Sequence, residues 1–158
     1  MDARFQKIVD KLLIIEGGYV DDPRDRGGET KFGISKRRYP ALDIKNLTKE
    51  QAVNIFYTDF WTMYGYDRIE DDRLAEKVFS FCVNMGPNQA HVILQIALNQ
   101  TGCRVVVDGL LGPKTIAAVN GHPNPAWLLA AYRLEVIKYY LSLEAGRFER
   151  GWIRRAVE

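Results

Sequence analysis

The stretch FQKIVDKLLIIEGGYVDDPRDRGGETKFGIS, residues 5–35, changes character at Glu16. Before Glu16, apolar residues recur at the spacing of one helix face, at Phe5, Ile8, Val9, Leu12 and Leu13. After Glu16, the pair Gly17-Gly18 ends the helix and a loop crowded with charged residues follows. The sequence therefore predicts an amphipathic helix that ends on a glutamate. An irregular loop, with a short hairpin within residues 19–35, should come next.

The remainder of the chain carries the signals of helices. Thr48-Lys49-Glu50-Gln51 has the pattern of a capping box and predicts a helix over 49–64. Apolar periodicity, Gly-Pro breaks and an Asn-Pro cap predict further helices over 72–85, 88–101, 113–120, 125–144 and 147–156. Because the apolar residues of 125–144 lie nearly all round, we expect that helix to be central and buried. The prediction is a mostly α chain, residues 1–158, in one domain.

Composition excludes several classes of function. Apolar residues make up 47% of the 158 residues and charged residues 27%, as in ordinary globular proteins. The net charge of +2 and the absence of a basic block give no reason to expect nucleic acid. The two cysteines and two histidines lack ligand spacing, so we expect no metal, no cofactor and no disulfide framework. No segment has the pattern of a signal peptide or a stable membrane insertion.

Glu16 is the first candidate for chemistry. It lies within roughly 40° of Leu12 and Phe5 around a helix of about 100° per residue, so it continues the apolar face. Partial burial and the negative end of the helix dipole would both raise the pKa of such a carboxyl. A carboxyl that stays protonated near neutral pH suits a general acid for glycoside cleavage. The alternative is a last-turn side chain that reaches solvent or pairs with Arg24 or Arg26.

Asp25 and Thr30 could complete a site with Glu16. They follow it on a short loop that turns at Gly27-Gly28, and a second carboxylate could hold a water or stabilise positive charge on a sugar ring. The alternative for Asp25 is an ion pair with a neighbouring Arg24, Arg26 or Lys31. Asp21 and Asp22 have the pattern of turn caps next to Pro23.

The string E-G-G-Y-x-x-D-P-x-D-x-G-G-x-T-x-x-G-I resembles the N-acetylmuramidases of glycoside hydrolase family 108, which are lysozyme-like. The segments VFSFCVNMGP, LQIALN, VDGLLGPKTIAAVN and GRFERGWIRR resemble further motifs of that family, so the likeness covers nearly the whole chain. It implies a compact lysozyme-like helical domain, with residues 1–86 as the catalytic part. Residues 87–158 would be a peptidoglycan-binding-like part packed into the same core.

The resemblance implies that Glu16 is the catalytic acid and that Asp25 and Thr30 take part. In phage lysozymes five residues separate the aspartate from the threonine, whereas four separate Asp25 from Thr30 here. Ser80 stands where the family usually has aspartate, Cys82 where it has alanine, and Met85 where it has a small residue.

Sugar contacts are predicted from aromatic rings near the loop and from positions that match the family motifs. The predicted substrate-binding residues are Tyr19, Asp22, Gly28, Gly33, Tyr57, Trp61, Asn84 and Gly86. An aromatic residue on a helix face is also a common core residue, and Asn84 before Gly86-Pro87 could equally be a cap. The element VDGLLGPKT resembles a peptidoglycan-binding element, but its Asp-Gly turn and Gly-Pro helix start could simply support the fold.

The sequence thus predicts a glycoside hydrolase that cleaves the β-1,4 bond between N-acetylmuramic acid and N-acetylglucosamine in peptidoglycan glycan strands. The alternative is a non-catalytic peptidoglycan-binding or secretion-regulating protein. We expect synthesis in the cytoplasm without a signal peptide and action in the periplasm or outside the inner membrane. Access to the wall would then need a holin, as for a phage endolysin, or a dedicated export system, as for a secretion activator. Whether the glycosidic configuration is inverted or retained depends on the separation of the carboxylates, which spacing in sequence does not give.

Overall fold

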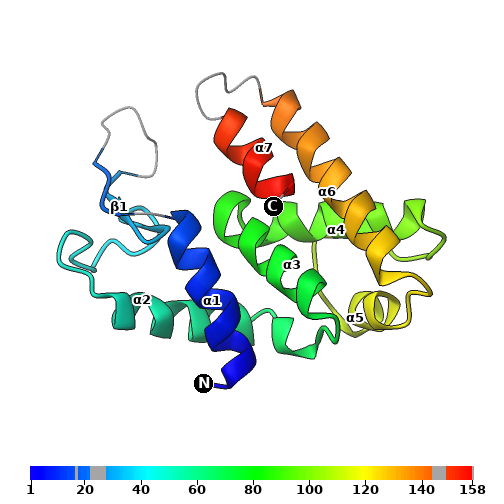
Figure 1. The fold of residues 1–158 in the computed structure, drawn as a ribbon, viewed down its shortest axis with the longest axis horizontal. Helices are drawn as coiled ribbons and strands as arrows, with labels where there is room; N and C mark the ends of the chain where they lie inside the picture. The colour runs from blue at the N-terminus through cyan, green and yellow to red at the C-terminus, as the bar shows by residue number, and fades with distance from the viewer. Residues whose placement is uncertain (17, 22–27, 144–148, 158) are drawn as a thin grey trace. The chain divides into compact units, whose positions relative to one another are not determined.

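A computed structural model of the chain describes residues 1–16, 18–21, 28–143 and 149–157, with the backbone alone at positions 16, 149 and 150. The chain forms two compact units, Met1–Met63 and Tyr64–Glu158. Helices dominate both, and the sheet among the described residues is a two-stranded hairpin (Figure 1). The prediction of a mostly α chain is confirmed. The expectation of one domain, with a catalytic part up to residue 86 and a second part in the same core, stays a prediction, and the boundary between the compact units falls at Met63.

The first unit begins with helix α1 (Ala3–Glu16), whose start is capped by the Asp2 carboxylate 2.7 Å from the backbone N–H of Phe5. The predicted apolar stripe of α1 is buried, with exposures from 0% at Phe5 to 8% at Leu13. Each such side chain contributes about 2 kcal/mol through removal of apolar surface from water. The helix ends at Glu16, as the glycine pair predicts.

Helix α2 (Lys49–Phe56) begins at the predicted capping box. The Thr48 hydroxyl accepts from the backbone N–H of Gln51 at 3.2 Å, and the Gln51 side chain accepts from that of Thr48 at 2.9 Å. The single helix predicted over 49–64 is wrong in its second half, because α2 passes into a π-helical turn, η1 (Tyr57–Thr62). The Thr62 hydroxyl donates to the Tyr57 carbonyl across this wider turn. Apolar periodicity does not distinguish an α turn from a π turn.

The second unit has a short 3-10 turn near its start, η2 (Tyr66–Arg68), and its described residues form five α-helices. They are α3 (Asp72–Met85), α4 (Pro87–Gln100), α5 (Pro113–Asn120), α6 (Pro125–Ser142) and α7 (Glu149–Val157). Helix α4 packs against both α3 and α6, and α6 packs against α7 (Figure 1). The chain turns from α3 into α4 at Gly86, whose φ of 89° is open to glycine and strained for other residues.

Helix α6 is not buried all round, contrary to the prediction. It buries Leu128, Tyr132, Val136 and Tyr140, which recur every four residues on one side of the helix. Apolar side chains on other sides stay exposed, among them Trp127 at 52%, Leu134 at 52% and Leu141 at 50%. Apolar residues all round a helix therefore did not establish burial, since only the side toward its packing partners is covered.

Candidate functional site

The loop that carries most of the predicted site begins and ends at a pair of hydrogen-bonded residues, Val20 and Thr30, which we call the clasp. Val20 and Thr30 form an isolated antiparallel bridge, with two N–H to O=C hydrogen bonds of 2.8 Å each. The bridge therefore pairs Thr30 with a residue only four positions after Glu16, the last residue of α1. The prediction of a short hairpin within 19–35 is confirmed.

The returning chain makes a tight hairpin. Strand β1 (Thr30–Lys31) pairs antiparallel with β2 (Ile34–Ser35) through a two-residue turn at Phe32 and Gly33. Both turn residues have positive φ, 54° and 79°, which is the geometry of a type I′ turn. A bulky residue with positive φ is uncommon, and such strain is held by the structure around it. Gly33 is therefore explained by backbone conformation, and the half-buried Phe32 ring lies at the hairpin tip.

Basic side chains of the first unit hold the chain after the hairpin. The Lys31 ammonium donates to the Lys45 carbonyl at 2.8 Å, and the Lys36 ammonium donates to the Leu42 carbonyl at 2.7 Å. The Tyr39 hydroxyl donates to the Asp59 carboxylate at 2.9 Å, and burial together with this hydrogen bond raises the pKa of Tyr39 to about 12. The two lysines therefore brace the chain that follows the hairpin, and the hydrogen bond from Tyr39 to Asp59 ties it to η1.

The predicted catalytic residues are described to different extents. Asp25, and Asp22 among the predicted sugar contacts, lie outside the described residues, and at Glu16 the structure gives the backbone at the last position of α1. The Thr30 hydroxyl donates to the carbonyl of Gly28 at 3.2 Å. Gly28 has a φ of 68°, so its backbone conformation calls for glycine.

The predicted aromatic contacts separate into exposed and buried rings. Tyr19 is 38% exposed beside the clasp and donates from its hydroxyl to the Glu29 carboxylate at 3.2 Å. Tyr57 is half-buried, with its ring edge-on to Phe5 at 5.0 Å between centroids. Trp61 is 0% exposed, and its ring centroid lies 5.5 Å from that of Phe5. In this structure it is therefore a core residue with no face open to a sugar.

Asn84 and Gly86 belong to the second unit. The Asn84 carboxamide oxygen accepts from the Tyr140 hydroxyl at 2.7 Å, which ties α3 to α6. Ser80, in the position where the resemblance expects aspartate, is 4% exposed. Its buried hydroxyl has no hydrogen-bond partner in the part of the chain that the structure describes. Asn84 therefore has a bracing role in the described structure, and the sugar contact stays a prediction.

A second arrangement of polar side chains was missed by the sequence reasoning. His91, Gln95 and Asn99 follow one another every four residues along α4 and hold the chain that leads from α4 to α5. The Gln95 carboxamide accepts from the N–H groups of Asp108 and Gly109 and donates to the Asp108 carboxylate at 2.8 Å and the Leu110 carbonyl at 3.0 Å. The partial signal in the sequence was a His and a Gln four residues apart among apolar residues of α4, since polar side chains buried there need hydrogen-bond partners.

His91, Gln95 and Asn99 form a ladder of polar side chains along α4, in which His91 and Gln95 are buried. The Nδ1 of His91 lies 3.1 Å from the Gly109 carbonyl and its Nε2 lies 2.8 Å from the Tyr66 hydroxyl. Burial lowers the pKa of His91, although the hydrogen bond to Gly109 acts in the opposite direction. A neutral ring that donates from Nδ1 and accepts at Nε2 satisfies both contacts.

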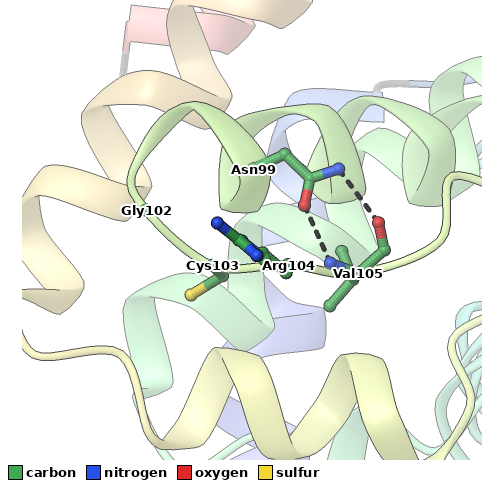
Figure 2. A pocket seen from close by; sticks show the side chains of 5 residues that line it. All are labelled: Asn99, Gly102, Cys103, Arg104 and Val105. Carbon is green, nitrogen blue, oxygen red and sulfur yellow. Dashed lines mark hydrogen bonds between the residues drawn. The ribbon is translucent and has the colours of Figure 1, made fainter.

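The segment held by the ladder borders two open grooves. The smaller, of about 510 Å³, is lined by Asn99 and residues 102–105 (Figure 2). The larger, of about 810 Å³, lies between the segment 104–112 and helix α5. Among the described residues, no group of three or more His, Cys, Asp or Glu side chains could hold a metal ion. None of the helices in the described ranges is long and apolar enough to span a bilayer.

Two family models match the chain, one up to Gly86 and the other after it. The model of glycosyl hydrolase 108 matches residues 9–86, which include Glu16, the loop and the hairpin. This part of the chain belongs to glycosyl hydrolase family 108. The model of a predicted peptidoglycan domain matches residues 89–157, which include the α4 ladder and both grooves. The family predicted by resemblance is confirmed, and with it a role in hydrolysing or binding peptidoglycan.

A solved structure is similar over nearly the whole chain. The structure of Brucella abortus SagA is similar over 97% of this chain and 89% of its own, with 26% identity and a TM-score of 0.79. The mostly α, lysozyme-like fold expected for the family is thereby confirmed. Among curated proteins, no sequence matches this chain.

Proposed function

We propose that this chain is an N-acetylmuramidase that cleaves the β-1,4 bond between N-acetylmuramic acid and N-acetylglucosamine. The observation that carries the proposal is the match of residues 9–86 to a glycosyl hydrolase family, which spans Glu16, Asp25 and Thr30 together. The clasp between Val20 and Thr30 supports it, because it folds the loop back to the helix end that bears Glu16.

Glu16 is proposed as the general acid that protonates the leaving glycosidic oxygen. Position 16 continues the helical stripe of Phe5 and Leu12, both of which are almost fully buried. It is also the last residue of α1, where the helix dipole places partial negative charge. A general acid must hold a proton when the substrate binds, and Glu16 is proposed to deliver that proton to the leaving oxygen.

Asp25 is proposed as the second carboxylate of the reaction. It would hold a water against the sugar ring or stabilise the positive charge that develops there. Thr30 is proposed to position that water. Its hydroxyl donates to the Gly28 carbonyl, so its oxygen lone pairs are left as acceptors for a water proton.

Sugar contacts in the first unit are proposed for Tyr19, Asp22, Gly28 and Gly33. Tyr19 supports this assignment best, because it is partly exposed, adjoins the clasp and is oriented by Glu29. An oriented aromatic ring with a free face suits a pyranose ring. The positive φ values of Gly28 and Gly33 let the backbone turn where a side chain would otherwise be strained.

The experiment is release of soluble fragments from purified sacculi by wild type, Glu16→Gln and Glu29→Gln. Loss of a general acid lowers the rate by about 10²–10⁴-fold, so Glu16→Gln should be nearly inactive. Glu29→Gln is the matched control, because it removes a carboxylate from the same loop and its amide oxygen still accepts from Tyr19. Equal release by wild type and Glu16→Gln would refute the assignment of Glu16.

A second function, binding of peptidoglycan without cleavage, is favoured by one specific observation. Residues 89–157 match a predicted peptidoglycan domain that contains none of the proposed catalytic residues. We propose that this half retains the wall polymer while the first half cuts it. A wild-type protein that sediments with sacculi and releases no fragments would support binding as the sole function.

A further inference from the structure

The chain between α4 and α5 contains a backbone segment that is held along one edge only. The Asn99 side-chain amide donates to the Val105 carbonyl at 3.0 Å and accepts from the Val105 N–H at 2.8 Å (Figure 2). In an extended backbone the N–H and C=O of one residue point to the same side, and those of its neighbours point to the other side. A side-chain amide that satisfies both groups of Val105 therefore indicates an extended backbone with that edge turned toward α4.

The opposite edge of this segment is open. The N–H and C=O of Val106 alternate with those of Val105 and so point away from Asn99, and no hydrogen bond within the described residues uses them. Val106 is 74% exposed. Exposed, unpaired strand edges are templates on which an extended peptide can add by backbone hydrogen bonds.

The large groove beside this edge has an unbalanced charge. Arg104 and Lys114 line it, both are exposed, and neither pairs with a carboxylate of the described residues. The one acid in the lining, Asp108, accepts from the Gln95 amide at 2.8 Å and from the Leu110 N–H at 2.9 Å. Both hydrogen bonds end on Oδ1 and, that from Gln95 first, lower the pKa of Asp108, so this carboxylate stays ionised and the lining holds one acid against two cations.

Helix α5 adds to this positive character. It begins at Pro113 after Gly112, and no side chain caps it. No hydrogen bond within the described residues uses the N–H groups of Lys114 and Thr115 in its first turn, and the positive end of the helix dipole lies there. The groove thus offers two cations and a helix start to a carboxylate, beside an open backbone edge and the exposed Leu110.

We propose that this groove binds the stem peptide of peptidoglycan rather than its glycan strand. The stem peptide is an extended, acidic chain, so its backbone can pair with the Val106 edge while its carboxylates meet Arg104 and Lys114. No aromatic ring is found among the described lining residues, so the groove lacks the flat platform on which a sugar stacks. The inference rests on the peptidoglycan role proposed above, and it assigns the two parts of the polymer to the two halves of the chain.

The test uses the full chain with Glu16→Gln, so that sacculi stay intact during binding. Sedimentation is measured with whole sacculi and with sacculi from which an amidase has removed the stem peptides, and calorimetry is done with a soluble muramyl tripeptide. The double variant Arg104→Ala/Lys114→Ala should weaken tripeptide binding at least about ten-fold, as expected for lost hydrogen bonds between charged groups. The matched control is Arg73→Ala/Lys138→Ala, which removes the same charge from surface pairs outside the groove.

A second pair of variants tests the backbone edge. Val106→Pro removes the outward N–H, whereas Val106→Ala keeps it and loses only apolar surface. Proline should abolish tripeptide binding with the melting temperature unchanged within a few degrees, and alanine should retain most of it.

The inference is overturned if binding to whole and peptide-free sacculi is equal, or if neither Arg104→Ala/Lys114→Ala nor Val106→Pro weakens tripeptide binding. Failure of the proposed hydrolysis is seen separately. In that case the wild-type protein, which keeps Glu16, releases no reducing ends from peptide-free glycan. The groove variants would still bind the tripeptide more weakly, as proposed.

Discussion

Replacement of Gln95 by leucine should remove the hydrogen bonds that hold the segment leading into α5, and should lower the free energy of unfolding. Gln95 is 0% exposed, and its carboxamide contacts Asp108, Gly109, Leu110 and the Thr115 hydroxyl. Leucine is similar in size, so the change removes hydrogen bonds with little change in volume. The loss therefore reports on the polar ladder rather than on a cavity.

The magnitude follows from which groups stay buried. Gly109 is buried, so its N–H would be left without a partner at a cost of about 1–3 kcal/mol. Asp108 and Leu110 are exposed, so their released groups can bond to water, and each lost hydrogen bond costs roughly 0.5–1 kcal/mol. The total is about 2.5–6 kcal/mol, which for a chain of this size lowers the melting temperature by roughly 5–24 °C.

Thermal unfolding followed by circular dichroism measures this difference. Gln100→Leu is the control, because it makes the same change on the same helix at an exposed site, where the side chain donates to Glu135 at 3.1 Å. The control should move the melting temperature by no more than about 2 °C. Equal effects of the two substitutions would refute the claim that the ladder holds the segment.

Three further predictions concern stability. Burial lowers the pKa of His91, so the unfolded chain binds a proton more readily than the folded chain. The free energy of unfolding should therefore fall as the pH drops below about 6.5. In urea titrations at several pH values, His91→Asn should reduce this dependence on pH. Thr48→Ala removes the capping box of α2 and should lower the unfolding free energy by about 1 kcal/mol in the same titrations; an unchanged midpoint would contradict the cap. Ser80→Ala removes a buried hydroxyl without a partner among the described residues, and should leave stability unchanged or raise it by up to about 1 kcal/mol; a clear loss would show that the hydroxyl is satisfied.

Much of the fold could be predicted from local patterns in the sequence. The stripe of α1, the capping box of α2 and the breaks at Gly86 and Pro113 each depend on residues close to one another in the chain. Such signals act through local backbone geometry and are readable without knowledge of tertiary contacts. The predicted start and end of α3 and of α5 are those observed.

Features that depend on long-range packing could not be predicted in this way. The burial of Trp61 depends on Phe5, far from it in the sequence, and the exposed side of α6 depends on which neighbours cover the helix. Likewise, the partners of Gln95 lie on the segment after α4, so its polar character alone did not show what it holds. For the site, Glu16 followed from helical phase, whereas the clasp between Val20 and Thr30 required the structure.

The most direct test of the central claim is mass analysis of the fragments released from purified peptidoglycan. A muramidase with Glu16 as its acid releases fragments with N-acetylmuramic acid at the reducing end, and Glu16→Gln releases almost none. Fragments that end in reducing N-acetylglucosamine, or the same fragments at the same rate from Glu16→Gln, would contradict the account.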